Sequence, residues 1–278
     1  SRIHIGFAVL QTSLYHPLRM AEQLSLLDNL SRGRLIVGLG RGSMVNLHEY
    51  SGYEIDPASA QERFEEIEQI LLKCWNGEKV AHAGKYWNFE IPMLRPRPFT
   101  KPHPQVLRSV ASEASLAAQA RLCRPVLMAA ATAPGAARNI AIYRQAAAEA
   151  GHAPAAIDAA IAQCWVARTV ILAPTDAEAQ EVGLPYFRQM QTYRAAQSTA
   201  FEARVAEMNA KPTLPVLCGA PETVMEDFTS LAETGIGGVF IRFRTRPMPA
   251  EFSTRALRLF MRDIAPRIAD HTQALAPA

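Results

Sequence analysis

A glycine-rich stretch with one arginine is the first place where this sequence could bind a ligand. Residues 31–43 read SRGRLIVGLGRGS, so an apolar run ends on Gly38, Gly40, Arg41 and Gly42. Glycine lets a backbone approach a ligand closely, and the forked guanidinium of arginine suits a phosphate. The same residues would equally suit a turn after a strand that carries a surface arginine. The stretch alone leaves both interpretations open.

A pair of serines is the second candidate for binding chemistry. The segment VASEAS spans residues 110–115, and a strand is expected before it and a helix after Ser112. Hydroxyl and free N–H groups at a helix N-terminus bind anions. An ordinary N-cap needs Ser112 alone and leaves Ser115 unexplained, although capping and phosphate binding can share the same amides. If the two strand ends are neighbours, Arg41 converges with both serines on one phosphate.

Two histidines and an arginine complete the set of candidate site residues. His16 and His48 follow expected strands, and imidazole titrates near neutrality, so either histidine is a candidate proton carrier. His16 would equally suit a helix lead-in, and His48 a solvated loop. Arg242 and Arg244 alternate along the last expected strand, which puts both on one side of it. Arg244 is the better candidate for binding an anionic group of a substrate or cofactor, and a surface ion pair is the alternative.

Strands alternate with helices along the chain, the pattern of a parallel sheet with crossover helices. The expected strands are residues 3–10, 34–39, 105–110, 125–130, 164–172 and 237–243. The expected helices are residues 17–30, 57–75, 113–123, 134–150, 219–235 and 251–268, with a helical region over about 175–209. In a (β/α) barrel the loops after the strands carry the active site. Those loops are residues 11–16, 40–56, 111–115, 130–134, 173–176 and 243–250.

The predicted fold class is α/β, a TIM (β/α)8-type barrel in a single partial domain over residues 1–278. About six of the eight strands are present, and the two N-terminal βα units are missing. The chain opens at Ser1 in strand-like sequence, which suggests a truncated start. A Pro-rich insertion over residues 76–104 is interpreted as a hairpin followed by an extended crossing. Its base lies away from the active face, so we expect structural roles for His82, Tyr86, Trp87 and His103.

Composition disfavours several classes of protein. The chain has 278 residues, 49% of them hydrophobic, which allows a well-buried core. Its net charge of +3 is spread along the chain, so we expect no nucleic-acid partner. With no signal peptide and no apolar run near the roughly 18 residues of a membrane helix, we expect a cytoplasmic protein without a membrane partner. The four cysteines are widely spaced and suggest neither a disulfide framework nor a metal site.

The glycine run is a poor match to a dinucleotide-binding loop. It reads GLGRGS, so the third glycine of a GxGxxG motif is displaced, and the residues that follow do not continue as a helix. No acidic residue ends a following strand about twenty residues later, where a ribose-binding partner would lie. A nucleotide-binding fold is therefore disfavoured.

Several motifs, in the same order, resemble the luciferase-like flavin monooxygenase family, which includes bacterial luciferase. They are FAVLQTSLYHPLRMAEQLSLLDNLSRGRLIVGLGRGS, ERFEEIEQILLKCW, GKYWNFE, RPRPFTKPHPQV and CGAPETVMEDFTSLAETGIGGVFIRF. The resemblance covers nearly all 278 residues. It implies an eight-stranded barrel that binds reduced FMN or, in a sister branch, a deazaflavin. The hairpin and the Pro-rich crossing favour the FMN branch.

The resemblance also assigns roles to residues of this chain. It implies that Arg41, Ser112 and Ser115 contact the flavin phosphate. The end of the first strand, with Gln11 and Thr12, and the backbone of Gly40 would lie near the isoalloxazine ring, and Tyr50 would border the cofactor. The segment VASEAS departs from many relatives, in which a proline lies between the serines.

The implied activity is that of a monooxygenase that oxidises a small organic substrate with reduced FMN and dioxygen. A separate flavin reductase would supply the reduced FMN, and the protein would form a homodimer. Relatives carry two further strands, often with a catalytic histidine, ahead of the point where this chain begins. Two alternatives therefore stay open: a non-catalytic flavin-binding subunit or fragment, and a deazaflavin-dependent hydride-transfer enzyme.

Overall fold

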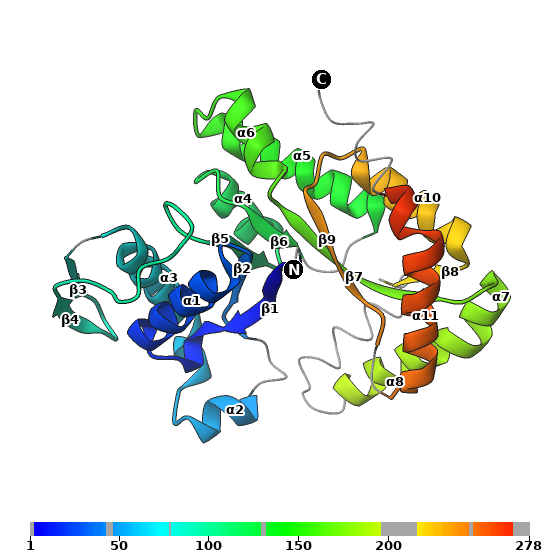
Figure 1. The fold of residues 1–278 in the computed structure, drawn as a ribbon, viewed down its shortest axis with the longest axis horizontal. Helices are drawn as coiled ribbons and strands as arrows, with labels where there is room; N and C mark the ends of the chain where they lie inside the picture. The colour runs from blue at the N-terminus through cyan, green and yellow to red at the C-terminus, as the bar shows by residue number, and fades with distance from the viewer. Residues whose placement is uncertain are drawn as a thin grey trace. The chain divides into compact units, whose positions relative to one another are not determined.

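The structure is a computed structural model that describes residues 3–42, 47–77, 79–128, 132–195, 216–244 and 247–268. The chain divides into two compact units, Ser1–Ser109 and Val110–Ala278, each of which is described by itself (Figure 1). Both units combine parallel strands with helices. The predicted α/β class is therefore confirmed.

The first unit is built on three parallel strands. β2 (Leu35–Gly40) lies between β1 (Ile5–Gln11) and β5 (Gln105–Val110), and all of its residues are buried. α1 (Pro17–Ser31) connects β1 to β2 and contacts α3 (Ala60–Asn76) (Figure 1). A central strand of a parallel sheet is covered on both faces, which explains the continuous apolar run of β2.

The helix predicted over residues 17–30 is present as α1, and the helix predicted over 57–75 begins three residues later as α3, whereas α2 (Leu47–Gly52) was not predicted. Pro17 occupies the first turn of α1, and the helix ends where Arg32 and Gly33 adopt left-handed conformations with φ of 55° and 79°. A short 3₁₀ turn, Pro57–Ser59, leads into α3. The apolar stripe of α3 packs into a core with α1 and β2, and consists of Phe64, Ile67, Ile70, Leu71 and Trp75.

The predicted hairpin consists of β3 (Val80–Ala83) and β4 (Asn88–Ile91), paired antiparallel. Glu66 of α3 holds it in place: its carboxylate accepts the N–H groups of Tyr86 and Trp87 at 3.1 and 2.9 Å and lies 3.0 Å from Nε2 of His82. Burial alone would raise the pKa of Glu66, but these hydrogen bonds together lower it below its usual value. His82, Tyr86 and Trp87 therefore have structural contacts.

The second unit centres on β7 (Trp165–Leu172). This strand pairs in parallel with β6 (Val126–Met128), β8 (Leu217–Gly219) and β9 (Gly238–Arg242). β8 is a short strand that the sequence analysis missed, and it brings the parallel strands among the described residues to seven.

The helices of the second unit cover β7 on both faces. They are α4 (Glu113–Ala120), α5 (Ala133–Glu149), α6 (Pro154–Ile161), α7 (Asp176–Glu178), α8 (Leu184–Ala195), α10 (Pro221–Ala232) and α11 (Ala250–Asp263). Val170 and Leu172 pack with α10 and α11, whereas Ile171 packs with Phe187 of α8. The helical region predicted over 175–209 is described only to residue 195, and the remainder lies outside the described residues. α6 was not predicted.

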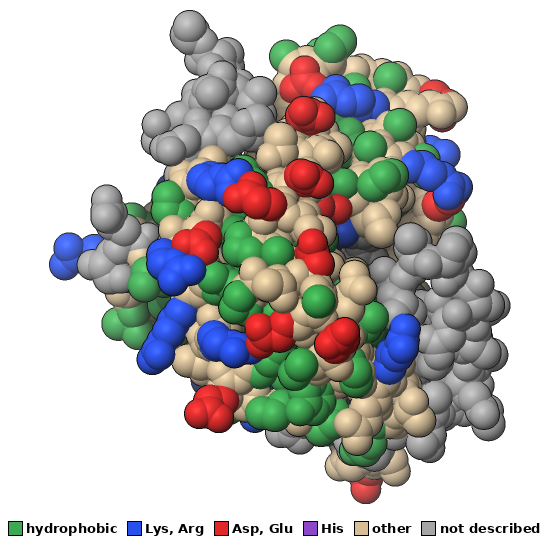
Figure 2. Space-filling view, turned by 90° about the vertical axis from the view of Figure 1, so that its right-hand side faces the viewer, with side chains coloured by type: hydrophobic (Ala, Val, Ile, Leu, Met, Phe, Trp, Pro, Cys, Tyr) green, Lys and Arg blue, Asp and Glu red, His purple; other side chains and the backbone are tan. Residues whose placement is uncertain are grey.

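Acidic and basic side chains are interspersed on the face of the molecule drawn in Figure 2. Several exposed residues form ion pairs in the second unit, for example Arg267 with Glu222 at 2.7 Å and Arg262 with Asp263 at 2.5 Å. Within the described ranges, each helix is too short or too polar to cross a bilayer.

Candidate functional site

A bulge in β1 explains the glycine run of β2. The pairing of the two strands shifts register between Phe7 and Leu10 of β1. A Cβ atom on Gly38 would lie 2.0 Å from the carbonyl oxygen of Phe7, and one on Gly40 would lie 2.4 Å from Cγ2 of Val9. The close approach of β1 therefore explains why glycine occupies both positions. Neither the ligand-binding interpretation nor the turn interpretation of this stretch included that reason.

Buried hydroxyl groups hold the backbone directly after β2. Oγ1 of Thr12 donates to the carbonyl oxygen of Gly40 at 3.3 Å. Oγ of Ser13 lies 3.0 Å from the carbonyl oxygen of Arg41. The hydroxyl of Tyr50 donates to the same carbonyl of Arg41. All three hydroxyl-bearing residues are at most 3% exposed, whereas the Arg41 side chain is exposed. The arrangement fixes the backbone of Arg41 and leaves its guanidinium available to a ligand.

Ser13 is the residue of this group that the sequence analysis missed. Its hydroxyl also lies 3.1 Å from the carbonyl oxygen of Ala60, at the start of α3. It therefore connects the end of β1 to both the loop after β2 and the following helix. The available signal was the pair of small hydroxyl residues, Thr12 and Ser13, directly after β1.

Gln11 carries an orphaned polar atom at the carboxyl end of β1. Its Nε2 atom is buried, and no acceptor among the described residues pairs with it. The amide lies against Gly42, which has a φ of +92°, and a Cβ atom there would lie 2.7 Å from Nε2. Leaving a buried donor unpaired costs about 1–3 kcal/mol, so such groups usually mark the place of a water or a ligand. This N–H group lacks an acceptor among the residues that the structure describes, and a bound ligand would be able to provide one.

Ser112 and Ser115 both serve the N-cap of α4. Oγ of Ser112 accepts the N–H of Ser115, and Oγ of Ser115 accepts the N–H of Ser112, each at 3.2 Å. This reciprocal capping box explains the second serine. The expectation that capping leaves Ser115 unexplained is therefore wrong, because Ser115 takes the place that Glu or Gln usually fills. Arg41 belongs to the other unit, so a shared phosphate site stays a prediction.

The candidate proton carriers are placed differently. His16 is exposed and occupies the N-cap position of α1, where its side chain makes no capping hydrogen bond. His48 lies on α2 (Leu47–Gly52), and its side chain is outside the part of the chain that the structure describes. Their roles in proton transfer stay predictions.

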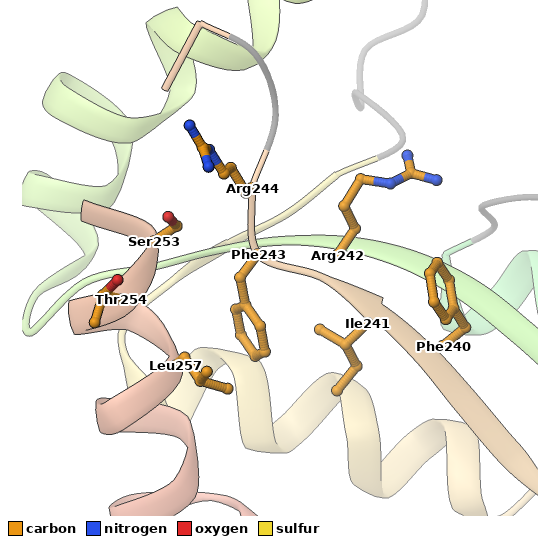
Figure 3. A pocket seen from close by; sticks show the side chains of 8 residues that line it. All are labelled: Phe240, Ile241, Arg242, Phe243, Arg244, Ser253, Thr254 and Leu257. Carbon is orange, nitrogen blue, oxygen red and sulfur yellow. The ribbon is translucent and has the colours of Figure 1, made fainter. Parts of the chain in front are cut away.

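A pocket of about 350 Å³ lies at the carboxyl end of β9, beside α11 (Figure 3). Arg242 and Arg244 lie on the same side of the chain, opposite Ile241 and Phe243, as the alternation predicted (Figure 3). Arg242 is partly buried, and burial lowers its pKa, whereas Arg244 is exposed. The lining residues are Phe240, Ile241, Arg242, Phe243, Arg244, Ser253, Thr254 and Leu257.

The fold and these strand-end residues define a parallel α/β protein with candidate ligand-binding groups at the carboxyl ends of its strands. The model of the luciferase-like monooxygenase family matches residues 1–237. The chain belongs to this family, as its motifs predicted.

Characterised relatives match a limited segment. The oxygenase component of flavin-dependent trigonelline monooxygenase from Acinetobacter baylyi is 27% identical over 104 residues, 37% of this chain and 29% of that protein. Limonene 1,2-monooxygenase from Rhodococcus erythropolis is 31% identical over 99 residues, 36% of this chain and 25% of that protein. These matches thus span less than a third of the length of each relative.

Solved structures share the fold over most of the chain. Monooxygenase RslO1 from Streptomyces bottropensis has a TM-score of 0.77 and 26% identity, covering 95% of this chain and 78% of that one. The oxygenating constituent of 3,6-diketocamphane monooxygenase from Pseudomonas putida, in complex with FMN, has a TM-score of 0.69 and 22% identity, covering 95% and 79%. The coenzyme F420 dependent tetrahydromethanopterin reductase from Methanopyrus kandleri has a TM-score of 0.69 and 17% identity, covering 96% and 83%. The fold is therefore common to proteins that use different flavin-type cofactors.

Proposed function

We propose that this protein is a flavin-dependent monooxygenase that binds reduced FMN at the carboxyl ends of β1 and β2. The observation that carries the proposal is the buried Nε2 of Gln11, which has no acceptor among the described residues. The pyrimidine side of a flavin ring presents carbonyl oxygens and ring nitrogens as acceptors. An unpaired N–H donor at a strand end therefore fits the edge of such a ring.

The other predicted residues would hold the remainder of the cofactor. Arg41 would bind the phosphate, because its guanidinium is exposed while its backbone is fixed by Ser13 and Tyr50. A fixed backbone leaves less conformational freedom to lose when the ligand binds. Ser112 and Ser115 would present their hydroxyl groups to a phosphate from the start of α4.

The cofactor, when bound, supplies the electrons with which dioxygen is activated to oxidise a small organic substrate. Gln11 and Thr12 would position the ring edge, and His16 and His48 are the candidates for moving protons at the substrate. The Acinetobacter relative is described as an oxygenase component. We propose that this chain likewise takes its reduced FMN from a separate reductase.

The variant Gln11→Leu tests the proposal, because it removes the orphaned donor and keeps a side chain of similar size. Reduced FMN should bind about 2- to 13-fold more weakly in an anaerobic titration, the equivalent of one neutral hydrogen bond of about 0.5–1.5 kcal/mol. The urea midpoint of the ligand-free protein should rise, because an unpaired buried donor is removed. The exposed Gln145 on α5 provides the control: Gln145→Leu should change neither quantity.

The FMN titration and the urea midpoint of Gln11→Leu together would also reveal a purely structural role for Gln11. Unchanged flavin affinity, or a fall in stability, would contradict the proposal. Tighter binding of reduced F420 than of reduced FMN in a parallel titration would favour the deazaflavin branch. Flavin binding without oxidation of any substrate in the presence of a reductase would identify a non-catalytic flavin-binding subunit.

A further inference from the structure

Ser13 connects three segments of the first unit through a single hydroxyl group. It lies in the 3₁₀ turn Thr12–Leu14, directly after β1, and is 1% exposed. Its Oγ atom lies 3.0 Å from the carbonyl oxygen of Arg41, after β2, and 3.1 Å from the carbonyl oxygen of Ala60, at the start of α3. The hydroxyl therefore fixes the residue that follows β2 against both the end of β1 and the next long helix.

Neither carbonyl depends on Ser13 alone for a hydrogen bond. The hydroxyl of Tyr50 also donates to the carbonyl oxygen of Arg41. The carbonyl oxygen of Ala60 belongs to the first turn of α3, where it accepts the N–H group four residues further along the helix. A buried hydroxyl beside two acceptors that already have donors adds little to stability. The contact therefore suggests a role in fixing position more than in stabilising the fold.

Three side-chain hydroxyl groups converge on two consecutive peptide groups at the end of β2. Thr12 donates to the carbonyl oxygen of Gly40 at 3.3 Å, while Ser13 and Tyr50 both contact the carbonyl oxygen of Arg41. These two carbonyls belong to the peptide planes on either side of the Arg41 Cα atom. Because a peptide group is planar, fixing both carbonyls fixes φ and ψ of Arg41. The hydroxyl groups therefore set the direction in which the Arg41 side chain leaves the backbone.

The Arg41 side chain depends on its backbone for that direction. It is exposed, and none of the described side chains forms a hydrogen bond or ion pair with its guanidinium. By contrast, the guanidinium of Arg108 on β5 is held by Glu68. A long side chain without such a partner keeps its rotamer freedom, so the backbone limits where its end can reach. The conformation of the Arg41 backbone therefore decides how well the guanidinium meets an anion.

We propose that Ser13 is a positioning residue for the flavin phosphate and acts through Arg41. Together with Tyr50, it holds the Arg41 backbone in the conformation from which the guanidinium reaches the phosphate. Binding then orders a side chain and not the loop as well, which lowers the entropic cost of binding. The proposal rests on the function proposed above, since it concerns the phosphate end of the same cofactor. It predicts an effect on FMN that riboflavin, which lacks the phosphate, does not share.

Anaerobic titrations with reduced FMN and reduced riboflavin test the proposal. Ser13→Ala should weaken FMN binding about 2- to 13-fold, because the released backbone has to be ordered on binding, and should leave riboflavin affinity unchanged. Tyr50→Phe should change the two affinities in the same way. Ser25 on α1 provides the matched control, because it is 0% exposed and its hydroxyl has no hydrogen-bond partner among the described residues. Ser25→Ala should retain both affinities.

A double-mutant cycle shows whether Ser13 acts through Arg41. In Arg41→Ala the guanidinium is absent, so adding Ser13→Ala should weaken FMN binding no further. Additive losses would overturn the proposal, and so would an unchanged FMN affinity in Ser13→Ala. A purely structural role would instead weaken FMN and riboflavin binding equally and lower the urea midpoint more than Ser25→Ala does, and this result would also overturn the proposal.

The same titrations separate this proposal from the proposed function. If Arg41→Ala loses part of the preference for FMN while Ser13→Ala and Tyr50→Phe keep all of it, the flavin site stands and the positioning role falls. If the wild type binds neither reduced flavin, the proposed function falls, and the positioning role falls with it.

Discussion

Replacing Gly38 by alanine tests whether the bulge of β1 dictates the glycine run of β2. A Cβ atom at this position would lie 2.0 Å from the carbonyl oxygen of Phe7 and 3.1 Å from its carbonyl carbon. Both atoms belong to the backbone, so no side chain can rotate away to relieve the overlap. Overpacking of this kind costs about 1–3 kcal/mol and occasionally more, and we expect Gly38→Ala to lie at or above the upper end.

Two further glycines in the same pair of strands, Gly40 and Gly6, provide comparisons for the loss of stability expected at Gly38. A Cβ atom on Gly40 would meet Cγ2 of Val9 at 2.4 Å, an overlap with a partly exposed side chain and not with backbone. A Cβ atom on Gly6 of β1 would come no closer than 3.4 Å to any atom, an ordinary contact. Gly6→Ala should therefore be neutral or stabilising by up to about 1 kcal/mol, because it restricts the unfolded chain.

Urea unfolding of the three alanine variants measures these differences. The free energy of unfolding should fall most for Gly38→Ala, less for Gly40→Ala and not at all for Gly6→Ala. Equal midpoints for Gly38→Ala and Gly6→Ala would refute the reasoning. The glycine at position 38 would then serve something other than the approach of β1.

Two other predictions concern groups that support the site and the hairpin. Tyr50→Phe removes one donor to the carbonyl of Arg41 and should lower the free energy of unfolding by about 0.5–1.5 kcal/mol in urea. Combining it with Ser13→Ala should cost more than the sum of the single changes, because both donors to that carbonyl are then lost, and simple additivity would contradict this. The pKa of Glu66 is held below its usual value of 4.5, so its stabilising effect is complete above that pH and is lost as the pH falls through the lower native value. Unfolding midpoints of the wild type and Glu66→Gln should differ at pH 7 and converge below pH 4.5, and a constant difference would contradict the pKa assignment.

The elements that the sequence predicts well are those with long, regular apolar patterns. The stripe of α3 and the apolar run of β7 each identify their element, because burial of these faces requires that periodicity. β8 was missed because it has only three residues, Leu217–Gly219, too few for a period. α6 was missed because its sequence, PAAIDAAI, is largely alanine and offers little contrast between its faces.

The places of the candidate residues at strand ends were predictable from the sequence, whereas their contacts were not. Arg41 and Gln11 lie at strand ends, where the chemistry of a parallel α/β fold is expected. The burial of the Gln11 amide without an acceptor among the described residues depends on how it packs against Gly42, which no local pattern reveals. The role of Ser13 depends on partners 28 and 47 residues further along the chain. The second serine of VASEAS was misinterpreted because a capping box with serine at its third helical position is uncommon.

The most direct test of the flavin site compares reduced FMN with reduced riboflavin, which lacks the phosphate. If Arg41 binds that phosphate, the wild type should prefer FMN by about 10- to 150-fold, the equivalent of about 1.5–3 kcal/mol for a charge-assisted contact. Arg41→Ala should lower that ratio to the smaller preference that the hydroxyl groups of Ser112 and Ser115 provide, whereas the exposed control Arg144→Ala should retain it. The same preference for FMN in the wild type and in Arg41→Ala would contradict the account.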